Sequence, residues 1–197
     1  MNHKEYLGDL IGGSLMLRES QIIADLLLQN TARDDWNEQI VDRNILQKRS
    51  SASAKRNAAT IKKRVGHLGK DFLELVAYGS SDLSTQGMLA ATLMNSPILA
   101  DFMRGIVMDA KRMYRESLDA SDWSHFWLER TRLFPDLVKM TESSTYKVGQ
   151  VAFKVLSDSG YIVSTRNKTL QNVYVLPEVK DILVHINRED IIQAMEA

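Results

Sequence analysis

Apolar residues recur every three to four positions along most of the chain, which is the spacing of helices that bury one side. Only three prolines interrupt the 197 residues, so long helices can form. Ser96-Pro97 is typical of a helix start, while Asp82 or Ser84, and Ser121, are candidate caps of two other helices. The pattern predicts helices over residues 15–30, 36–46, 48–66, 71–78, 82–94, 96–118 and 121–133.

The pattern changes after Pro135. A further helix has its apolar side at Val148, Val151, Ala152, Val155 and Leu156. Residues 161–163 and 173–175 are then β-branched or aromatic, and the polar residues between them indicate a β-hairpin with its loop at residues 166–168. A helix followed by a two-stranded wing is the order of a winged helix, and residues 177–197 look like one or two closing helices.

These patterns predict a mainly α fold. We expect a helical bundle over residues 1–140 and a winged-helix-like C-terminal segment over residues 141–197 that contains a small β-hairpin. No low-complexity linker separates the two segments, so one compact domain remains an alternative.

Composition indicates a folded protein of a reducing compartment. Hydrophobic residues make up 44% of the chain, and the absence of cysteine excludes disulfides, thiolate zinc sites and a cysteine nucleophile. The most hydrophobic stretch, residues 87–103, is interrupted by Asn95, Pro97 and Asp101, so it does not predict a membrane span. Glu5 and Asp9 likewise break the apolar region that a secretory signal needs. We expect a cytoplasmic protein without a membrane partner.

The charges are distributed unevenly along a chain whose net charge is zero. Between Arg43 and Lys70 there are nine Lys or Arg residues and no Asp or Glu, so the other residues hold 16 cations and all 25 carboxylates. The neutral average therefore conceals a strong asymmetry of charge along the sequence, although most charge runs are simply the solvated face of a helix.

Within this block, pairs of cations repeat every seven residues: Lys48/Arg49, Lys55/Arg56 and Lys62/Lys63, followed by Arg64. On a helix these pairs share one side, and Ala54, Ala58, Ile61, Val65 and Leu68 fall on the other. Solvated helix faces usually mix charge signs, whereas like charges at this spacing repel. Two interpretations remain open: the face binds the phosphates of a nucleic acid, or carboxylates elsewhere in the chain cover it.

A second set of polar residues lies in the predicted winged segment. Lys147, Gln150 and Lys154, with Thr145 and Tyr146, fall on the outward side of the helix, a set able to contact phosphates and base edges. Arg166 and Lys168 lie at the predicted wing tip. Winged helices also serve as protein-interaction modules, so both uses stay open.

No motif in the sequence predicts a catalytic site, a cofactor-binding site or a metal site. Residues 66–71 resemble a phosphate-binding loop, but Arg64 replaces its first glycine and Asp71 its Ser or Thr. The four histidines are scattered. His125 and Glu129 are one helical turn apart and form the best candidate acid–base pair, although the flanking tryptophans favour a packed structural histidine. We therefore expect no enzyme activity, no cofactor and no metal.

Three stretches carry a resemblance to a known family: "GGSLMLRESQIIADLL", "NILQKRSSASAKRNAATIKKRVGHL" and "SSTYKVGQVAFKVLSDSGYI". The chain resembles the BrxA family, small core proteins of the bacteriophage-exclusion (BREX) defence systems, over nearly its whole length. The resemblance implies a mainly helical fold, likened to antitermination-type RNA-binding bundles, and a non-enzymatic, DNA-binding accessory role. It brings no catalytic motif.

Together these observations predict a DNA-binding accessory of phage defence, with double-stranded DNA and other BREX components as partners and RNA as a further possibility. The alternative is a protein-interaction scaffold whose basic face docks an acidic partner. An unrecognised hydrolase would instead require His125 or clustered carboxylates in an open cleft.

Overall fold

The computed structural model of the chain describes residues 2–30 and 32–197, without the side chains of residues 33 and 34. The described residues are mainly helical, as the apolar spacing predicts. The α-helices are α1 (His3–Leu7), α2 (Leu17–Leu28), α3 (Arg33–Asn37), α4 (Ser51–Val65), α5 (Lys70–Tyr78), α6 (Ser81–Asn95), α7 (Pro97–Phe102), α8 (Met108–Arg112), α9 (Ala120–Leu133), α10 (Glu142–Asp158), α11 (Pro177–His185) and α12 (Glu189–Met195). Short 3-10 or π segments are η1 (Leu10–Gly12), η2 (Glu38–Asp42), η3 (Met103–Val107) and η4 (Pro135–Lys139).

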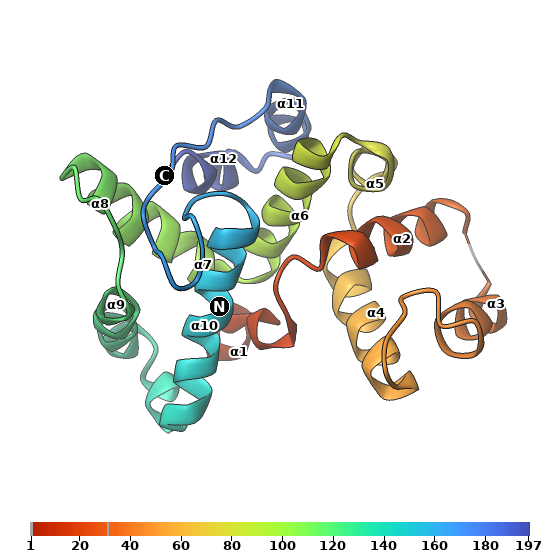
Figure 1. Cartoon of the computed structure of the whole chain (residues 1–197), viewed down its shortest axis with the longest axis horizontal. Coiled ribbons are helices and arrows are strands. Elements are labelled where there is room, and N and C mark those ends of the chain that lie inside the picture. Colours follow the sequence, from red (N-terminus) through yellow and green to blue (C-terminus); the bar gives the residue numbers. More distant parts are fainter. Residues whose placement is uncertain (1, 31) are drawn as a thin grey trace.

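Helix α6 is the central element of the fold. It contacts α2, α4 and α5 on one side and α7, α11 and α12 on the other, which divides the molecule into two lobes (Figure 1). Eight consecutive residues of α6, from Gln86 to Leu93, are buried. A helix that is buried all round needs small residues where neighbours approach closely, and Gly87, Ala90 and Ala91 supply them.

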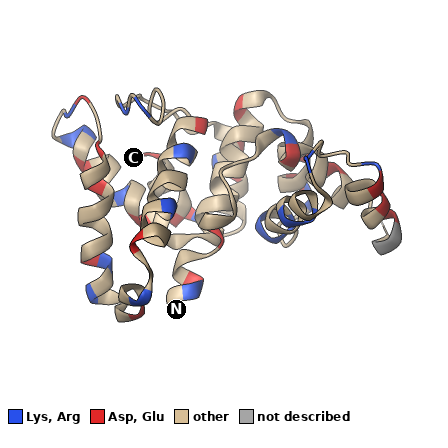
Figure 2. Cartoon of the chain, turned by 60° about the horizontal axis from the view of Figure 1, so that its bottom comes forward, with Lys and Arg blue, Asp and Glu red and all other residues tan. Residues whose placement is uncertain are grey.

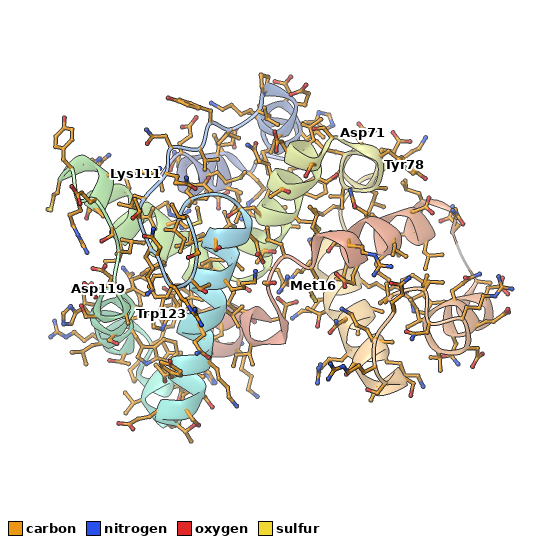
Figure 3. The ribbon with its side chains drawn as sticks, in the orientation of Figure 1. Met16, Asp71, Tyr78, Lys111, Asp119 and Trp123 are labelled. Atoms are coloured by element: carbon orange, nitrogen blue, oxygen red, sulfur yellow. The ribbon has the colours of Figure 1, made fainter. Side chains whose placement is uncertain are left out.

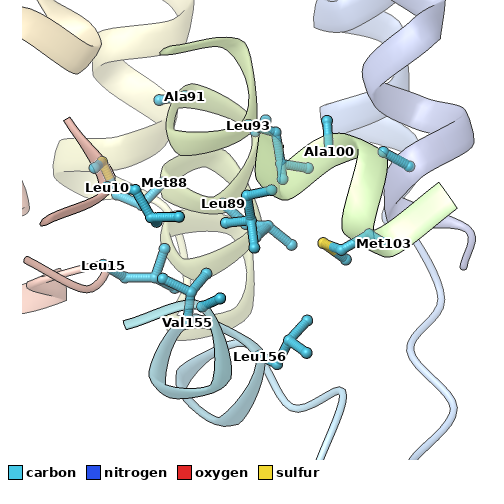
Figure 4. Packing of buried hydrophobic residues seen from close by; sticks show 14 of the residues in the cluster. Leu10, Leu15, Met88, Leu89, Ala91, Leu93, Ala100, Met103, Val155 and Leu156 are labelled. Atoms are coloured by element: carbon cyan, nitrogen blue, oxygen red, sulfur yellow. The ribbon is translucent and has the colours of Figure 1, made fainter. Parts of the chain in front are cut away.

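A single cluster of buried apolar residues runs through both lobes. Figure 4 shows Leu10 and Leu15 of the N-terminal region beside Met88 of α6 and Val155 and Leu156 of α10. The domain boundary near residue 140 stays a prediction. The shared core contains residues from both sides of it. Among the described residues, no helix is long and apolar enough to cross a membrane.

Several helix ends differ from those predicted. The basic helix begins at Ser51, not at residue 48, because the Ser50 hydroxyl accepts the Ser53 backbone N–H (3.2 Å) as its cap. Ser80 caps α6 and Asp119 caps α9, each upstream of the predicted caps.

The predicted helix over residues 96–118 also ends early. It runs as α7, η3 and α8 and stops at Arg112, and Tyr114 beyond it has a positive φ of 55°. Proline occupies the first turn as predicted, but the Ser96 side chain makes no capping hydrogen bond.

The predicted β-hairpin is wrong. No strand forms among the described residues, and residues 161–163 lie against 169–171 through a single antiparallel bridge between Ile162 and Leu170. The second β-type run bonds instead to a side chain: the Gln86 amide donates to the Tyr174 carbonyl and accepts from the Leu176 N–H, both at 2.8 Å. The C-terminal segment therefore lacks the two-stranded wing of a winged helix.

Candidate nucleic-acid interface

Helix α4 is amphipathic, as the sequence predicts. Its buried side consists of Ala54, Ala58, Ile61 and Val65, which pack in the core against α2, α6 and η2. The alanines let the helix lie close to its neighbours, so its backbone position is fixed by packing. Its other side faces solvent, and Figure 2 shows lysine and arginine gathered there.

Three cations of α4 are exposed and have no partner among the described residues, so they are available to an external anion. Lys55, Arg56 and Lys63 are exposed, and none of them has an ion pair or hydrogen bond with another described residue. Arg49, in the loop before the helix, is exposed and unpaired in the same sense. These four residues are called the free cations below.

The cations of α4 form two rows. With about 100° per residue, Lys55 and Lys62 align in one row and Arg56 and Lys63 in a second, roughly 100° around the helix. The strip between the rows holds Ala52 and Ala59, both exposed and small. A linear polyanion can therefore approach the helix backbone between two lines of positive charge.

Lys48 is held by a carboxylate of the same chain. Its ammonium lies 2.6 Å from the Glu19 carboxylate of α2, and both side chains are largely buried. Burial opposes ionisation of Glu19, but the hydrogen bond from Lys48, the Glu19 backbone N–H and nearby positive charge together hold its pKa below the ordinary value. Lys48 thus ties the loop before α4 to α2 and is committed to that contact.

Lys62 is engaged as well. Its ammonium lies 4.4 Å from the centre of the Trp36 ring of α3, a cation–π contact. The side chain remains exposed, so it can leave the ring at a modest cost.

Arg64 does not belong to the exposed face, which corrects its assignment as a phosphate ligand. It is fully buried and donates to Asp9 (3.0 Å) and to the backbone carbonyls of Ser14 (2.6 Å) and Gly13 (2.9 Å). Its guanidinium anchors α4 to the segment that follows α1. No local pattern indicates this use, because the partners lie 50 to 55 positions away in the chain.

The second predicted set lies in the other lobe, around a groove between α9 and α10. Gln150, Lys154 and Lys168 line the groove, and Lys147 and Arg166 are exposed beside it. Lys154 pairs with Asp158 on the same helix, and the Lys168 ammonium lies 5.2 Å from the centre of the Phe153 ring. The two predicted sets therefore do not form one continuous surface (Figure 1).

The apolar lining of this groove was not predicted from the sequence. Its largest exposed apolar side chains are Leu128, Val138 and Tyr146, from α9, η4 and α10. The available signal was the number of apolar residues on α9 and α10, which exceeds what one buried side requires.

His125 is exposed and makes no hydrogen bond with another described residue, so the prediction of a packed histidine is wrong. It lies outside the groove lining. No group of His, Asp or Glu among the described residues is arranged to hold a metal ion.

The fold and α4 define a class: mainly helical proteins of two lobes, one of which exposes a cationic helix. A sequence model of the family described as BrxA matches residues 4–187. The chain is 40% identical over 195 residues to the BREX protein BrxA of Escherichia coli O9:H4 (strain HS), covering 99% of this chain and 92% of that protein. It is 32% identical over 197 residues to the BREX protein BrxA of Paramagnetospirillum magneticum, covering 100% and 98%.

A crystal structure of an uncharacterized protein from Magnetospirillum magneticum has the same fold, with a TM-score of 0.88, 30% identity and 98% coverage of both chains. The chain belongs to the BrxA family of the BREX phage-defence systems, as the sequence resemblance indicates.

Proposed function

We propose that this protein is a non-enzymatic accessory of a BREX system that binds double-stranded DNA through α4. The observation that carries the proposal is the set of free cations Arg49, Lys55, Arg56 and Lys63, which no carboxylate of the described chain neutralises. Like charges this close cost free energy unless an anion offsets them. A phosphodiester backbone supplies that anion in a linear form.

The dimensions of the face suit a duplex. From Lys55 to Lys63 the helix rises about 12 Å, at about 1.5 Å per residue. Duplex DNA carries about one negative charge per 1.7 Å of its axis, so several phosphates lie within reach of the two rows. The alanine strip between them lets the phosphate backbone come close without a steric block.

Binding of this kind is expected to depend strongly on salt and weakly on base sequence. Lys and Arg side chains that contact phosphates release condensed counterions, and each contact contributes about −0.9 to the slope of log K against log salt. Four free cations therefore predict a slope of log K against log salt of about −3.6. None of these contacts reads a base edge, so unrelated duplexes should bind alike.

The test is a fluorescence-anisotropy titration of labelled duplexes and matched RNA with the full chain, over about 50 to 200 mM salt. A triple variant, Lys55→Gln, Arg56→Gln and Lys63→Gln, should reduce affinity and flatten the salt slope by about 2.7. The matched control carries Lys4→Gln, Arg112→Gln and Arg132→Gln, which removes the same charge from exposed residues outside α4. The control should keep the wild-type slope.

Two results would contradict the proposal. One is absence of duplex binding at about 50 mM salt, where phosphate contacts are strong. The other is an equal loss in the triple variant and in its control, which would mean that net charge alone matters. If RNA binds more tightly than duplex DNA, the cationic face of α4 remains the binding site, but its ligand is RNA.

The alternative function uses the same face. An acidic surface of another BREX component would also neutralise the free cations, as Glu19 already does for Lys48 within the chain. Purification of the tagged protein with and without nuclease distinguishes the two, because only a protein partner stays bound after nucleic acid is digested. Loss of that partner in the triple variant would favour the scaffold.

A further inference from the structure

The groove between α9 and α10 has a volume of about 1040 Å³. One wall is α9, a second is α10, and η4 and the loop around Lys168 close its ends. Trp123 lies between the two helices at its base (Figure 3). The groove is remote from α4, so nothing in the DNA proposal uses it.

Both walls present the side that a helix uses to pack against another helix. On α10 the lining begins at Glu142 and repeats three, four, seven, eight, eleven and twelve positions later, ending at Lys154. On α9 it begins at Ala120 and repeats three, four, seven and eight positions later, ending at Leu128. Stripes of this spacing are the sides by which helices pack on one another, and at Trp123 and Gly149 the two walls already do so.

The exposed part of these walls combines polar residues, such as Gln150 and Lys154, with three large apolar side chains. Leu128, Val138 and Tyr146 are 60%, 69% and 65% exposed, although each belongs to a residue type that is usually covered. They come from three separate elements and meet around one groove. A concave apolar surface of this kind is typical of a protein-interaction site.

The dimensions favour a helix over a small molecule. The lined part of α10 spans twelve residue steps, or about 18 Å, which is the length of roughly three helical turns. Small-molecule sites usually measure about 300–1,000 Å³ and enclose most of the ligand. This groove, at about 1040 Å³, lies at the upper end of that range, and its length matches a helix.

Charge around the groove is concentrated at one end. Lys154 and Lys168 line that end, and Arg166 is exposed two positions before Lys168, whereas Lys147 lies along α10 nearer to Glu142 than to Lys154. Asp158 pairs with Lys154 at this end and Asp119 precedes the lining residue Ala120, while Glu142, the carboxylate of the lining, lies about 18 Å away at the other end of the lined stretch. An occupant with carboxylates at the cationic end would complement this distribution.

We propose that the groove receives an amphipathic α-helix of another protein, about three turns long, with its apolar side between α9 and α10. Its carboxylates lie beside Lys154 and Lys168. The occupant completes a three-helix bundle in which Leu128, Val138 and Tyr146 are buried. The protein thus has a second interaction surface, separate from the basic helix α4.

The probes for this proposal are three fluorescein-labelled helical peptides of about 14 residues, long enough to fill the groove. Two carry the same leucine side, flanked by Glu in one and by Lys in the other; the third has the acidic composition in scrambled order. Titration with the full chain should show saturable binding of the acidic amphipathic peptide. The lysine and scrambled peptides should bind at least tenfold more weakly.

Two leucines of α9 provide a matched pair of variants. Leu128 and Leu133 are 60% and 65% exposed, but only Leu128 lines the groove. Leu128→Gln should lower the affinity for the acidic amphipathic peptide at least tenfold, whereas Leu133→Gln should leave that affinity unchanged. Lys154→Gln combined with Lys168→Gln should reduce the preference for the acidic over the lysine peptide. Circular dichroism of each variant checks that the fold is kept.

Each other outcome overturns the proposal. Equal binding of the acidic and lysine peptides, or equal effects of the two leucine variants, removes the stated occupant or the stated site. Self-association that Leu128→Gln abolishes, without peptide binding, makes the groove a contact between copies of this chain. Binding of single-stranded oligonucleotide or of a small apolar dye in place of any peptide assigns it to those ligands.

Discussion

Arg64 donates a hydrogen bond of 3.0 Å to Asp9, a residue 55 positions earlier in the chain, from within the most basic helix of the molecule. Its neighbour Lys63 points to solvent and has no described partner. Two adjacent cations of one run therefore have opposite uses: one fixes the helix in the fold, and the other remains free for an external anion.

Replacement of Arg64 should cost stability without acting directly on DNA. Arg64→Met leaves Asp9 and two backbone carbonyls without their donor in a buried site, and loss of one partner of a buried ion pair costs about 3–5 kcal/mol. Lys63→Met should change the free energy of unfolding by less than about 0.5 kcal/mol, since the side chain is exposed. Urea unfolding of both variants measures the difference.

The DNA titration gives the complementary readout. Lys63→Met should reduce the salt slope by about 0.9, the contribution of one phosphate contact. Arg64→Met, assayed at a temperature where it is folded, should keep the wild-type slope. If Arg64→Met unfolds at the wild-type urea concentration, the buried anchor is not the role of Arg64.

The pair of Glu19 and Lys48 should make stability depend on pH. The folded pKa of Glu19 lies below its ordinary value of 4.5, so its stabilising contribution is present above that pH and is lost as the pH falls through the folded pKa. Glu19→Gln should lower stability at pH 7 by about 1 kcal/mol, and the difference from wild type should shrink towards pH 3.

Thermal unfolding of wild type and variant across this pH range measures the effect. The control is Glu74→Gln, which removes an exposed pair with Lys70 at 3.3 Å. Exposed pairs contribute little, so that variant should track the wild type at every pH. A Glu19→Gln difference that persists undiminished at pH 3 would contradict the ion-pair explanation.

The basic helix shows how far the sequence could be interpreted. Its buried side, Ala54, Ala58, Ile61 and Val65, follows from helical period alone and is confirmed. Its start was placed three residues early, because the seven-residue repeat of cations continues through a loop in which the Asn44 side chain bonds both backbone groups of Lys48. Local charge spacing does not reveal that contact, and no local pattern shows which cation meets Asp9 or Glu19.

The β-type run at residues 173–175 was misinterpreted for a related reason. Val173, Tyr174 and Val175 suit an extended backbone, but their partner is decided by tertiary contacts. The Gln86 amide takes the place of a neighbouring strand, and Gln86 lies 88 positions before Tyr174. A buried glutamine in the middle of an apolar helix was the one hint available.

The contact between Lys62 and Trp36 should make Lys62 a weaker DNA ligand than Lys63. To contact a phosphate, Lys62 must leave the ring, and a cation–π contact at an exposed site is worth about 0.5–1 kcal/mol. Lys62→Gln should therefore reduce duplex affinity by a smaller factor than Lys63→Gln. Trp36→Leu should release Lys62 and slightly strengthen DNA binding, measured by anisotropy. A larger loss in Lys62→Gln than in Lys63→Gln would mean that Trp36 presents Lys62 to the phosphate.

Gly149 determines how closely α9 and α10 approach. A Cβ atom there would lie 2.5 Å from Cδ1 of Trp123, a ring that is itself buried among Phe102, Phe126 and Trp127 and cannot move freely. Gly149→Ala should therefore destabilise the protein by about 1–3 kcal/mol, despite the better helix propensity of alanine. It should also alter Trp fluorescence and weaken binding of the acidic peptide, because a displaced Trp123 changes the base of the groove.

Gly105 is the matched control: a Cβ there meets no atom within 4 Å, so Gly105→Ala should be neutral or stabilise by about 0.5–1 kcal/mol. Equal effects of the two substitutions in urea unfolding would show that backbone flexibility, and not the contact with Trp123, explains the glycine at position 149.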